Sequence, residues 1–225
     1  MQKSMIKLLS IADVVSLTNA ILGFLAILMI FSNETRLAFS FILLTLLADG
    51  LDGIVARKTR KGELGEYMEA MADMISLGIA PAFFVYNTYY DVVSDYLYYH
   101  TLLVVVLIIF LSLGIIRLAS FHIIKEEKFF VGLPASASTI FILVLSFLQT
   151  ELIYILPFIF LISIVMVSPL RFPKIGLKIK AFAAVLILVT LIFGSIYHSF
   201  APLMLFFALA VYAVLGPIYV RKKSS

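Results

Sequence analysis

The sequence has 225 residues, of which 63% are hydrophobic and only 13% are charged, and its mean hydropathy is +1.14. A soluble globular domain is about 45–50% apolar and about 25% charged. The composition therefore excludes a water-soluble globular protein and predicts an all-α, polytopic membrane protein that forms a single membrane domain over residues 1–225. The absence of cysteine excludes disulfides and thiolate chemistry.

Apolar stretches long enough to form membrane-spanning helices recur along the whole chain. Such a helix needs about 20 mostly apolar residues. We expect eight transmembrane helices, of which the fifth is the shortest, at residues 12–32, 37–57, 66–88, 99–120, 133–148, 151–169, 178–197 and 200–219.

The basic residues indicate how these helices are oriented. If both termini are cytoplasmic, the inside segments contain all of the 17 Lys and Arg residues except Arg36. Lys and Arg are enriched in cytoplasmic loops, so this distribution supports an even number of helices with both termini inside. We expect the protein to be integral to the cell membrane.

Four carboxylates lie where a membrane helix should be apolar. Asp49 and Asp52 lie near the end of the second stretch, and Glu69 and Asp73 lie near the start of the third. Each acid at membrane depth costs roughly 2.5–3.5 kcal/mol on insertion scales. One such acid is most often a helix-end residue that reaches water. Four acids in two pairs would repel one another, and they predict a functional site that contains compensating positive charge.

The spacing of these acids predicts a cation site. At 3.6 residues per turn, Asp49 and Asp52 share one face of their helix, and Glu69 and Asp73 share one face of the next. A short segment joins the two helices, so they are expected to be antiparallel neighbours with facing acids. Oxygen ligands without nearby His or Cys favour Mg²⁺, Mn²⁺ or Ca²⁺ and disfavour zinc.

The same residues resemble a known family motif. The run from Asp49 to Arg57, followed by Gly65, Glu69 and Asp73, is similar to the pattern D-x-x-D-G-x-x-A-R-x8-G-x3-D-x3-D of the CDP-alcohol phosphotransferase family. The chain departs from the motif twice: seven residues instead of eight separate Arg57 from Gly65, and Glu69 replaces the third aspartate. The longer Glu side chain could alter the spacing of a bound metal.

The resemblance implies an activity and a set of ligands. In this family a CDP-linked lipid transfers its phosphatidyl group to an alcohol, and CMP leaves. Two divalent cations, Mg²⁺ or Mn²⁺, would be held by Asp49, Asp52, Glu69 and Asp73, and Asp73 would also be the general base. The residues implied to bind the CDP-lipid are Thr18, Asn19, Gly53, Ala56, Arg57 and Gly65.

Segments outside the shared motif resemble members of the family that accept serine, the phosphatidylserine and archaetidylserine synthases. The run from Asp73 to Ala82 is similar to their D-x-x-S-F-G-x-A-P-A element, and residues 117–121 and 130–134 to R-L-A-R-F and F-x-G-L-P. Ser76 and Arg117 are therefore expected to bind the acceptor. The resemblance covers a core at about 12–175, and two further helices follow at 178–219.

The resemblance also implies the partners of the chain. The expected substrates are CDP-diacylglycerol or CDP-archaeol and L-serine, the surroundings are membrane lipids, and the assembly is a homodimer. We expect no nucleic-acid partner.

Two alternatives stay open from the sequence. The same fold and chemistry could use another acceptor, such as glycerol phosphate or an inositol phosphate, although the extra phosphate would require more basic residues. An ion transporter is the alternative from another class, because acids within the membrane also mark ion pathways. Against it, no polar residues continue across the second and third helices to form a path.

Overall fold

The computed structural model describes residues 5–58, 64–121, 123–124, 126, 129–174, 176–193 and 200–224. Within these ranges the side chains of residues 5, 7, 12, 51–58, 177–178 and 223–224 lie outside the description. The elements in chain order are a 3₁₀ turn η1 (Met5–Leu8), α1 (Ile11–Phe31), α2 (Thr35–Lys58), α3 (Gly65–Asp73), a π-helical turn η2 (Met74–Ile79), α4 (Ala80–Val93), α5 (Leu97–Phe121), β1 (Phe129–Val131), α6 (Ala135–Phe147), α7 (Leu152–Val167), β2 (Arg171–Pro173), α8 (Leu177–Phe193) and α9 (Phe200–Ser224).

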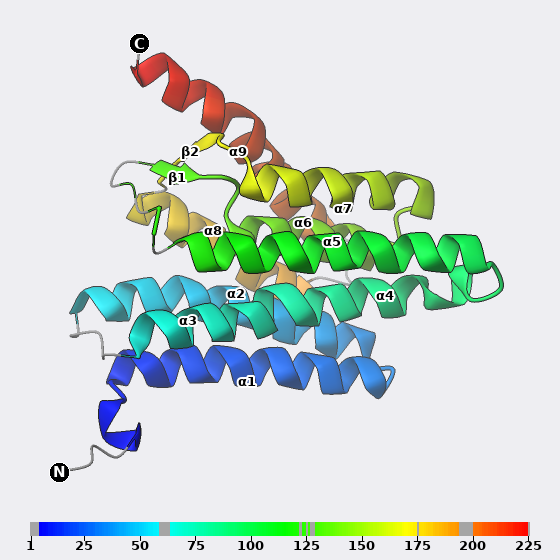
Figure 1. Cartoon of the computed structure of the whole chain (residues 1–225), viewed down its shortest axis with the longest axis horizontal. Coiled ribbons are helices and arrows are strands. Elements are labelled where there is room, and N and C mark those ends of the chain that lie inside the picture. The colour runs from blue at the N-terminus through cyan, green and yellow to red at the C-terminus, as the bar shows by residue number, and fades with distance from the viewer. Residues whose placement is uncertain are drawn as a thin grey trace.

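The helices form a bundle of rods that lie side by side (Figure 1). Because α3, η2 and α4 follow one another without a break, the nine α-helices of the described chain make eight rods. The start of α1 and the end of α9 lie at the same end of the bundle (Figure 1). The prediction of an all-α polytopic architecture is confirmed, and each of the eight stretches predicted from the sequence corresponds to one rod.

The length and composition of these helices suit a membrane. Four helices of the described chain are long and apolar enough to cross one, and they span Asp13–Phe31, Gly65–Val93, Leu97–Phe121 and Phe200–Lys222. Three shorter apolar helices accompany them, at Ala135–Phe147, Leu152–Val167 and Ile179–Phe193. Large apolar side chains are exposed on the outside of the bundle, among them Phe24, Ile108 and Phe207. In a bilayer such exposed faces contact lipid.

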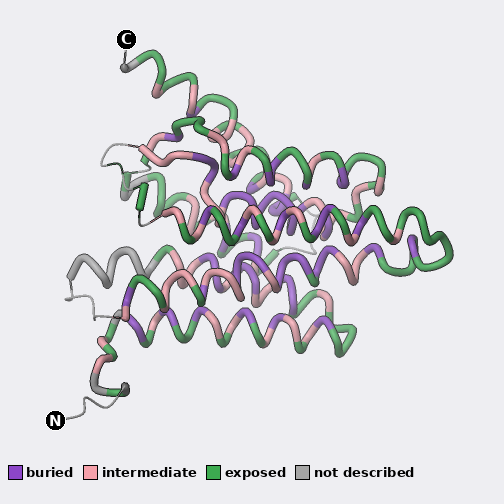
Figure 2. Tube along the Cα trace, in the orientation of Figure 1, coloured by how far each residue is buried: buried purple, intermediate pink, exposed green. Residues whose placement is uncertain are grey.

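The short helix α6 is the centre of the packing. Nine of its 13 residues are buried and none is exposed, and the interior of the bundle is drawn in purple in Figure 2. Its apolar side chains take part in the three hydrophobic clusters of the core, through Leu143, Ile142 and Phe141 respectively. A helix that is apolar on all sides is usually enclosed by other protein. At 13 residues α6 is only about 20 Å long, shorter than the roughly 30 Å hydrocarbon core, which suits a helix surrounded by its neighbours.

A small β-ribbon that the sequence analysis did not predict closes one end of the bundle. β1 and β2 pair antiparallel, with Phe130 opposite Phe172. Helix α9 holds the ribbon, because the Tyr212 hydroxyl donates a hydrogen bond to the Pro173 carbonyl at 3.1 Å. The ribbon lies at the end of the bundle where α5, α7 and α9 finish (Figure 1).

Gly132 ends the ribbon in a conformation that requires glycine. Its φ is +75°, and a Cβ at this position would lie 2.1 Å from the Met166 carbonyl oxygen. Its N–H donates to the Leu170 carbonyl at 2.8 Å. The left-handed backbone and the close approach both exclude a side chain here.

We therefore expect Gly132→Ala to destabilise the fold by about 2–5 kcal/mol, from backbone strain and from overpacking. Thermal unfolding of the protein purified in detergent measures this. The matched control is Gly176→Ala, because a Cβ there meets nothing within 4 Å. Equal melting temperatures for Gly132→Ala and the parent would contradict this account of the ribbon.

Candidate active site

The proposed general base, Asp73, is held by a hydrogen bond from the first helix. The Asn19 Nδ2 atom donates to the Asp73 Oδ1 atom at 3.1 Å. Asn19 is fully buried, and Asp73, the last residue of α3, is half-buried. Two residues that are 54 positions apart in the sequence are thus joined where α1 packs against α3.

Asn19 belongs to a polar stripe on the buried face of α1. Asp13, Ser16 and Asn19 are all buried, and with Gly23 they recur every three or four residues, so they lie along one side of the helix. Asp13 also caps the helix: its carboxylate accepts a hydrogen bond from the Ser10 N–H at 2.7 Å. Thr18 and Asn19 were predicted as site residues, and Ser16 was not. Ser16 and Asn19 are three residues apart on a predicted helix, and this spacing could have indicated that they share one face.

The acids predicted to bind metal lie on helices that contact α1. Asp49 on α2 and Glu69 and Asp73 on α3 are half-buried, and both helices pack against α1. Among the described residues no three His, Cys, Asp or Glu side chains form a group that could hold a metal ion. The side chain of the fourth acid, Asp52, lies outside the described residues.

The residues predicted to bind the CDP-lipid are distributed differently. Asn19 is buried on α1, and Gly65 is buried at the start of α3, the helix that carries Glu69 and Asp73. Thr18 lies on the exposed side of α1, and its hydroxyl donates to the Val14 carbonyl of the same helix at 2.9 Å. The side chains of the remaining three residues lie outside the described part of the chain; they are Gly53, Ala56 and Arg57.

Ser76, predicted to bind the acceptor, is buried in a close contact between helices. A Cβ placed on Gly23 would lie 2.7 Å from the Ser76 Cα atom, so the backbones of α1 and η2 touch. The Ser76 side chain is fully buried, and its Oγ atom has no hydrogen-bond partner. In this position Ser76 packs against α1 and is closed to solvent.

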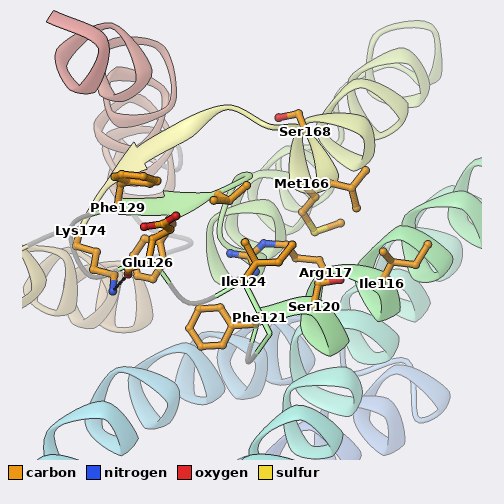
Figure 3. A pocket seen from close by; sticks show the side chains of 13 residues that line it. Ile116, Arg117, Ser120, Phe121, Ile124, Glu126, Phe129, Met166, Ser168 and Lys174 are labelled. Carbon is orange, nitrogen blue, oxygen red and sulfur yellow. Dashed lines mark hydrogen bonds between the residues drawn. The ribbon is translucent and has the colours of Figure 1, made fainter. Parts of the chain in front are cut away.

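Arg117, the other predicted acceptor residue, lines a pocket of about 110 Å³ beside the ribbon. Figure 3 shows Arg117 and Ser120 from α5 together with Ser168 after α7 and Lys174 after β2. The Arg117 Nε atom donates to the Leu133 carbonyl at 3.3 Å, and the guanidinium lies 5.4 Å from the centre of the Phe121 ring. Arg117 is therefore a buried cation with one N–H fixed by the backbone and others on the pocket side.

Arg117 and Asp73 lie at similar depths along the bundle. Gly78 and Leu111 are adjacent, since a Cβ on Gly78 would lie 3.7 Å from the Leu111 Cδ2 atom. Arg117 follows Leu111 by about 9 Å of helix, and Asp73 precedes Gly78 by five residues of the same rod. Because α5 runs antiparallel to the rod that contains α3 and α4, both displacements lead toward the same end (Figure 1).

Comparison with known proteins identifies the family. A family model described as CDP-alcohol phosphatidyltransferase matches residues 9–215. The chain belongs to the CDP-alcohol phosphatidyltransferase family. The match extends beyond the core at 12–175 and includes α8 and most of α9.

Several curated members of this family are similar to the chain over most of its length. A CDP-diacylglycerol–serine O-phosphatidyltransferase of Methanocaldococcus jannaschii is 35% identical over 218 residues, which cover 96% of each chain. An archaetidylserine synthase of Methanothermobacter thermautotrophicus is 33% identical over 77% of this chain and 73% of its own. A CDP-diacylglycerol–serine O-phosphatidyltransferase of Helicobacter pylori is 30% identical over 76% of both.

The contact between Gly23 and Ser76 generates a prediction about the site. An alanine at position 23 gains about 1 kcal/mol of helix propensity over glycine. It must also push α1 away from backbone atoms of η2, and such overpacking costs about 1–3 kcal/mol. We expect Gly23→Ala to lower the melting temperature in detergent and to reduce the rate of the transferase reaction of the family.

Gly114→Ala on α5 is the matched control, because a Cβ there meets nothing within 4 Å. This variant should melt at or above the temperature of the parent. A Gly23→Ala protein that is as stable and as active as the parent would show that α1 and η2 do not need this close approach.

Proposed function

We propose that this chain transfers a phosphatidyl group from a CDP-linked lipid to the hydroxyl of L-serine and releases CMP. The observation that carries the proposal is the half-buried Asp73 carboxylate, held by the Asn19 amide at the acid-rich end of the bundle. The names of the relatives, which cover most of the chain, support serine as the acceptor. The donor is CDP-diacylglycerol or CDP-archaeol.

Divalent metals are used in this family, and we propose that two ions, Mg²⁺ or Mn²⁺, bind this chain. The ligands would be Asp49, Asp52, Glu69 and Asp73. This donor set contains only carboxylate oxygens, which hard cations prefer. The Asn19 Oδ1 atom, buried and without a hydrogen-bond partner, adds a polar oxygen beside Asp73. When bound, such ions stabilise the charge on the attacking and leaving oxygens of a displacement at phosphorus.

Asp73 is the proposed general base of the reaction. The serine hydroxyl oxygen forms a bond to the phosphorus of the phosphatidyl group, and the bond from that phosphorus to the CMP oxygen breaks. The hydroxyl proton passes to the Asp73 carboxylate. The hydrogen bond from Asn19 occupies Oδ1 and restricts the rotation of the side chain, so that the carboxylate is oriented before the substrates bind.

The CDP-lipid is proposed to bind along α1, α2 and α3. Asn19 and Gly65 are buried on these helices, and the motif residues Gly53, Ala56 and Arg57 follow Asp52 on α2. Arg57 would supply a cation for the pyrophosphate. Thr18, on the exposed side of α1, is the member of this set that the fold supports least.

The orientation and assembly of the protein are also proposals. Since the basic residues gather in alternate loops, we propose that the acid-rich end faces the cytoplasm and that the membrane is the cell membrane. We propose a homodimer on the resemblance to the family.

Release of CMP from CDP-diacylglycerol or CDP-archaeol tests the reaction directly. We expect the purified protein to release CMP only when L-serine and Mg²⁺ or Mn²⁺ are both present, and to lose this activity in excess EDTA. Glycerol phosphate and inositol phosphate should be poor acceptors. Asp49→Asn should reduce turnover with every acceptor, because it removes a proposed metal ligand. Full turnover in EDTA, or faster release with glycerol phosphate than with serine, would disprove this assignment.

The Arg117 pocket generates a prediction about the acceptor. Free serine carries a carboxylate, and a guanidinium can bind it through two parallel hydrogen bonds, which lysine cannot reproduce. The loss of such a contact costs roughly 1.5–3 kcal/mol, or about ten- to a hundredfold in binding. We expect Arg117→Lys to raise the KM for serine by this factor and to leave the KM for CDP-lipid nearly unchanged.

The contrary result also has a structural meaning. If Arg117→Lys weakens CDP-lipid binding and spares serine, Arg117 belongs to the donor site. Lys174, on the same pocket, would then be the next candidate partner of the serine carboxylate. Its ammonium donates to the Glu126 carbonyl. In that case Lys174→Met should raise the KM for serine, and otherwise it should leave this KM unchanged.

A further inference from the structure

The rod that carries Asp73 changes from α-helical to π-helical geometry directly after this residue. η2 spans Met74–Ile79, and at its end the Ala80 N–H bonds to the Ile75 carbonyl, five residues earlier. Single π-turns inside α-helices are rare and occur frequently at functional sites. The transition sets the direction in which the last residue of α3, Asp73, leaves the helix.

A hydrogen bond from another helix reaches a carbonyl of this turn. Pro81 follows the turn and has no N–H, so it donates to none of the carbonyls in it. A buried carbonyl needs a hydrogen-bond donor, because an unpaired carbonyl loses its bonds to water without gaining any in the protein. The carbonyl of Leu77 accepts a hydrogen bond from outside the rod: the Thr139 hydroxyl donates to it at 2.6 Å.

Thr139 is well placed to hold the turn. It lies on the central helix α6 and is fully buried. The contact spans 62 positions of sequence, and α6 is enclosed by packing on nearly every side. The π-turn is therefore tied to a helix that its neighbours enclose.

On the opposite side the same rod is held by α1. Asn19 bonds to the Asp73 carboxylate, and one turn further along α1 the Gly23 backbone touches Ser76. Asn19 and Thr139 thus fix the rod at two points, one on the carboxylate and one on the turn that follows it.

We propose that Asn19 and Thr139 are positioning residues that orient Asp73 for catalysis, an inference that rests on the proposed function of Asp73. Thr139 acts through the π-turn, and Asn19 acts on the carboxylate itself. A catalytic group displaced by about 1 Å loses up to about a hundredfold in rate. Both residues should therefore affect kcat, and Thr139, which belongs to neither proposed substrate site, should affect kcat much more than the binding of either substrate.

Thr139→Val tests the first contact, because it removes the hydroxyl and keeps the shape of the side chain. We expect kcat to fall about tenfold or more with both KM values within about threefold of the parent, and Thr139→Ser to restore at least half of the parent kcat. The matched control is Ser163→Ala on α7, a buried hydroxyl that donates to the Ile159 carbonyl of its own helix at 2.7 Å. This control should keep the parent kcat.

Asn19→Leu tests the second contact. It removes the amide donor at similar volume, and we expect kcat to fall by about ten- to a hundredfold, with the KM for CDP-lipid free to rise because Asn19 also belongs to the proposed donor site. A raised KM for CDP-lipid with the parent kcat would leave Asn19 a donor-binding role alone and would overturn the inference. An unchanged kcat in both Thr139→Val and Asn19→Leu would overturn it as well.

A second measurement does not depend on turnover. Titration of the purified protein with Mn²⁺, followed by electron paramagnetic resonance, reports metal binding at the acids. We expect Asn19→Leu and Thr139→Val to weaken Mn²⁺ binding at least fivefold, and Ser163→Ala to leave it unchanged. If the parent binds Mn²⁺ but releases no CMP with serine, the proposed function fails while the positioning is still tested. Equal Mn²⁺ affinity in all variants would contradict the inference.

Discussion

The hydrogen bond from the Asn19 amide to the Asp73 carboxylate joins the first and third helices at the acid-rich end of the bundle. In apolar surroundings a polar group needs a partner, and other polar groups near this end are paired in the same way. The Leu77 carbonyl is bonded by Thr139, and the Leu133 carbonyl by Arg117. Each bond joins segments that are distant in sequence. Because each would be costly to break inside the bundle, they hold the ends of the rods in a defined arrangement on which the site depends.

Close packing also fixes the helices at this end of the bundle. The backbones of α1 and η2 touch at Gly23 and Ser76, which brings the polar stripe of α1 against the rod that carries Asp73. Small residues allow this approach, as in other membrane helix pairs. The central helix α6 supports the rod from the other side, and its burial on nearly all faces leaves little freedom for Thr139. The position of a single carboxylate thus depends on the packing of three rods.

The ribbon and the last helix extend this arrangement to the pocket around Arg117. Tyr212 on α9 bonds to the Pro173 carbonyl, and Gly216 lets α9 approach Pro173, where a Cβ would lie 2.9 Å from the proline Cδ atom. The ribbon in turn forms one wall of the pocket. The final two helices, which the sequence analysis described only by their hydropathy, therefore contribute through α9 to the shape of a proposed substrate site.

Local features of the sequence were sufficient for the helices and for the placement of the acids on them. Hydropathy reports the surroundings of each segment, so the eight stretches and the all-α class followed from it, and the spacing of Asp49, Glu69 and Asp73 followed from helical periodicity. Only the tertiary structure revealed the ribbon, the π-turn, the bond from Thr139 to Leu77, and the burial of Ser76 beside an exposed Thr18. These features depend on contacts between residues up to 62 positions apart, and the pattern of one segment contains no information about which distant segment will donate a hydrogen bond to it.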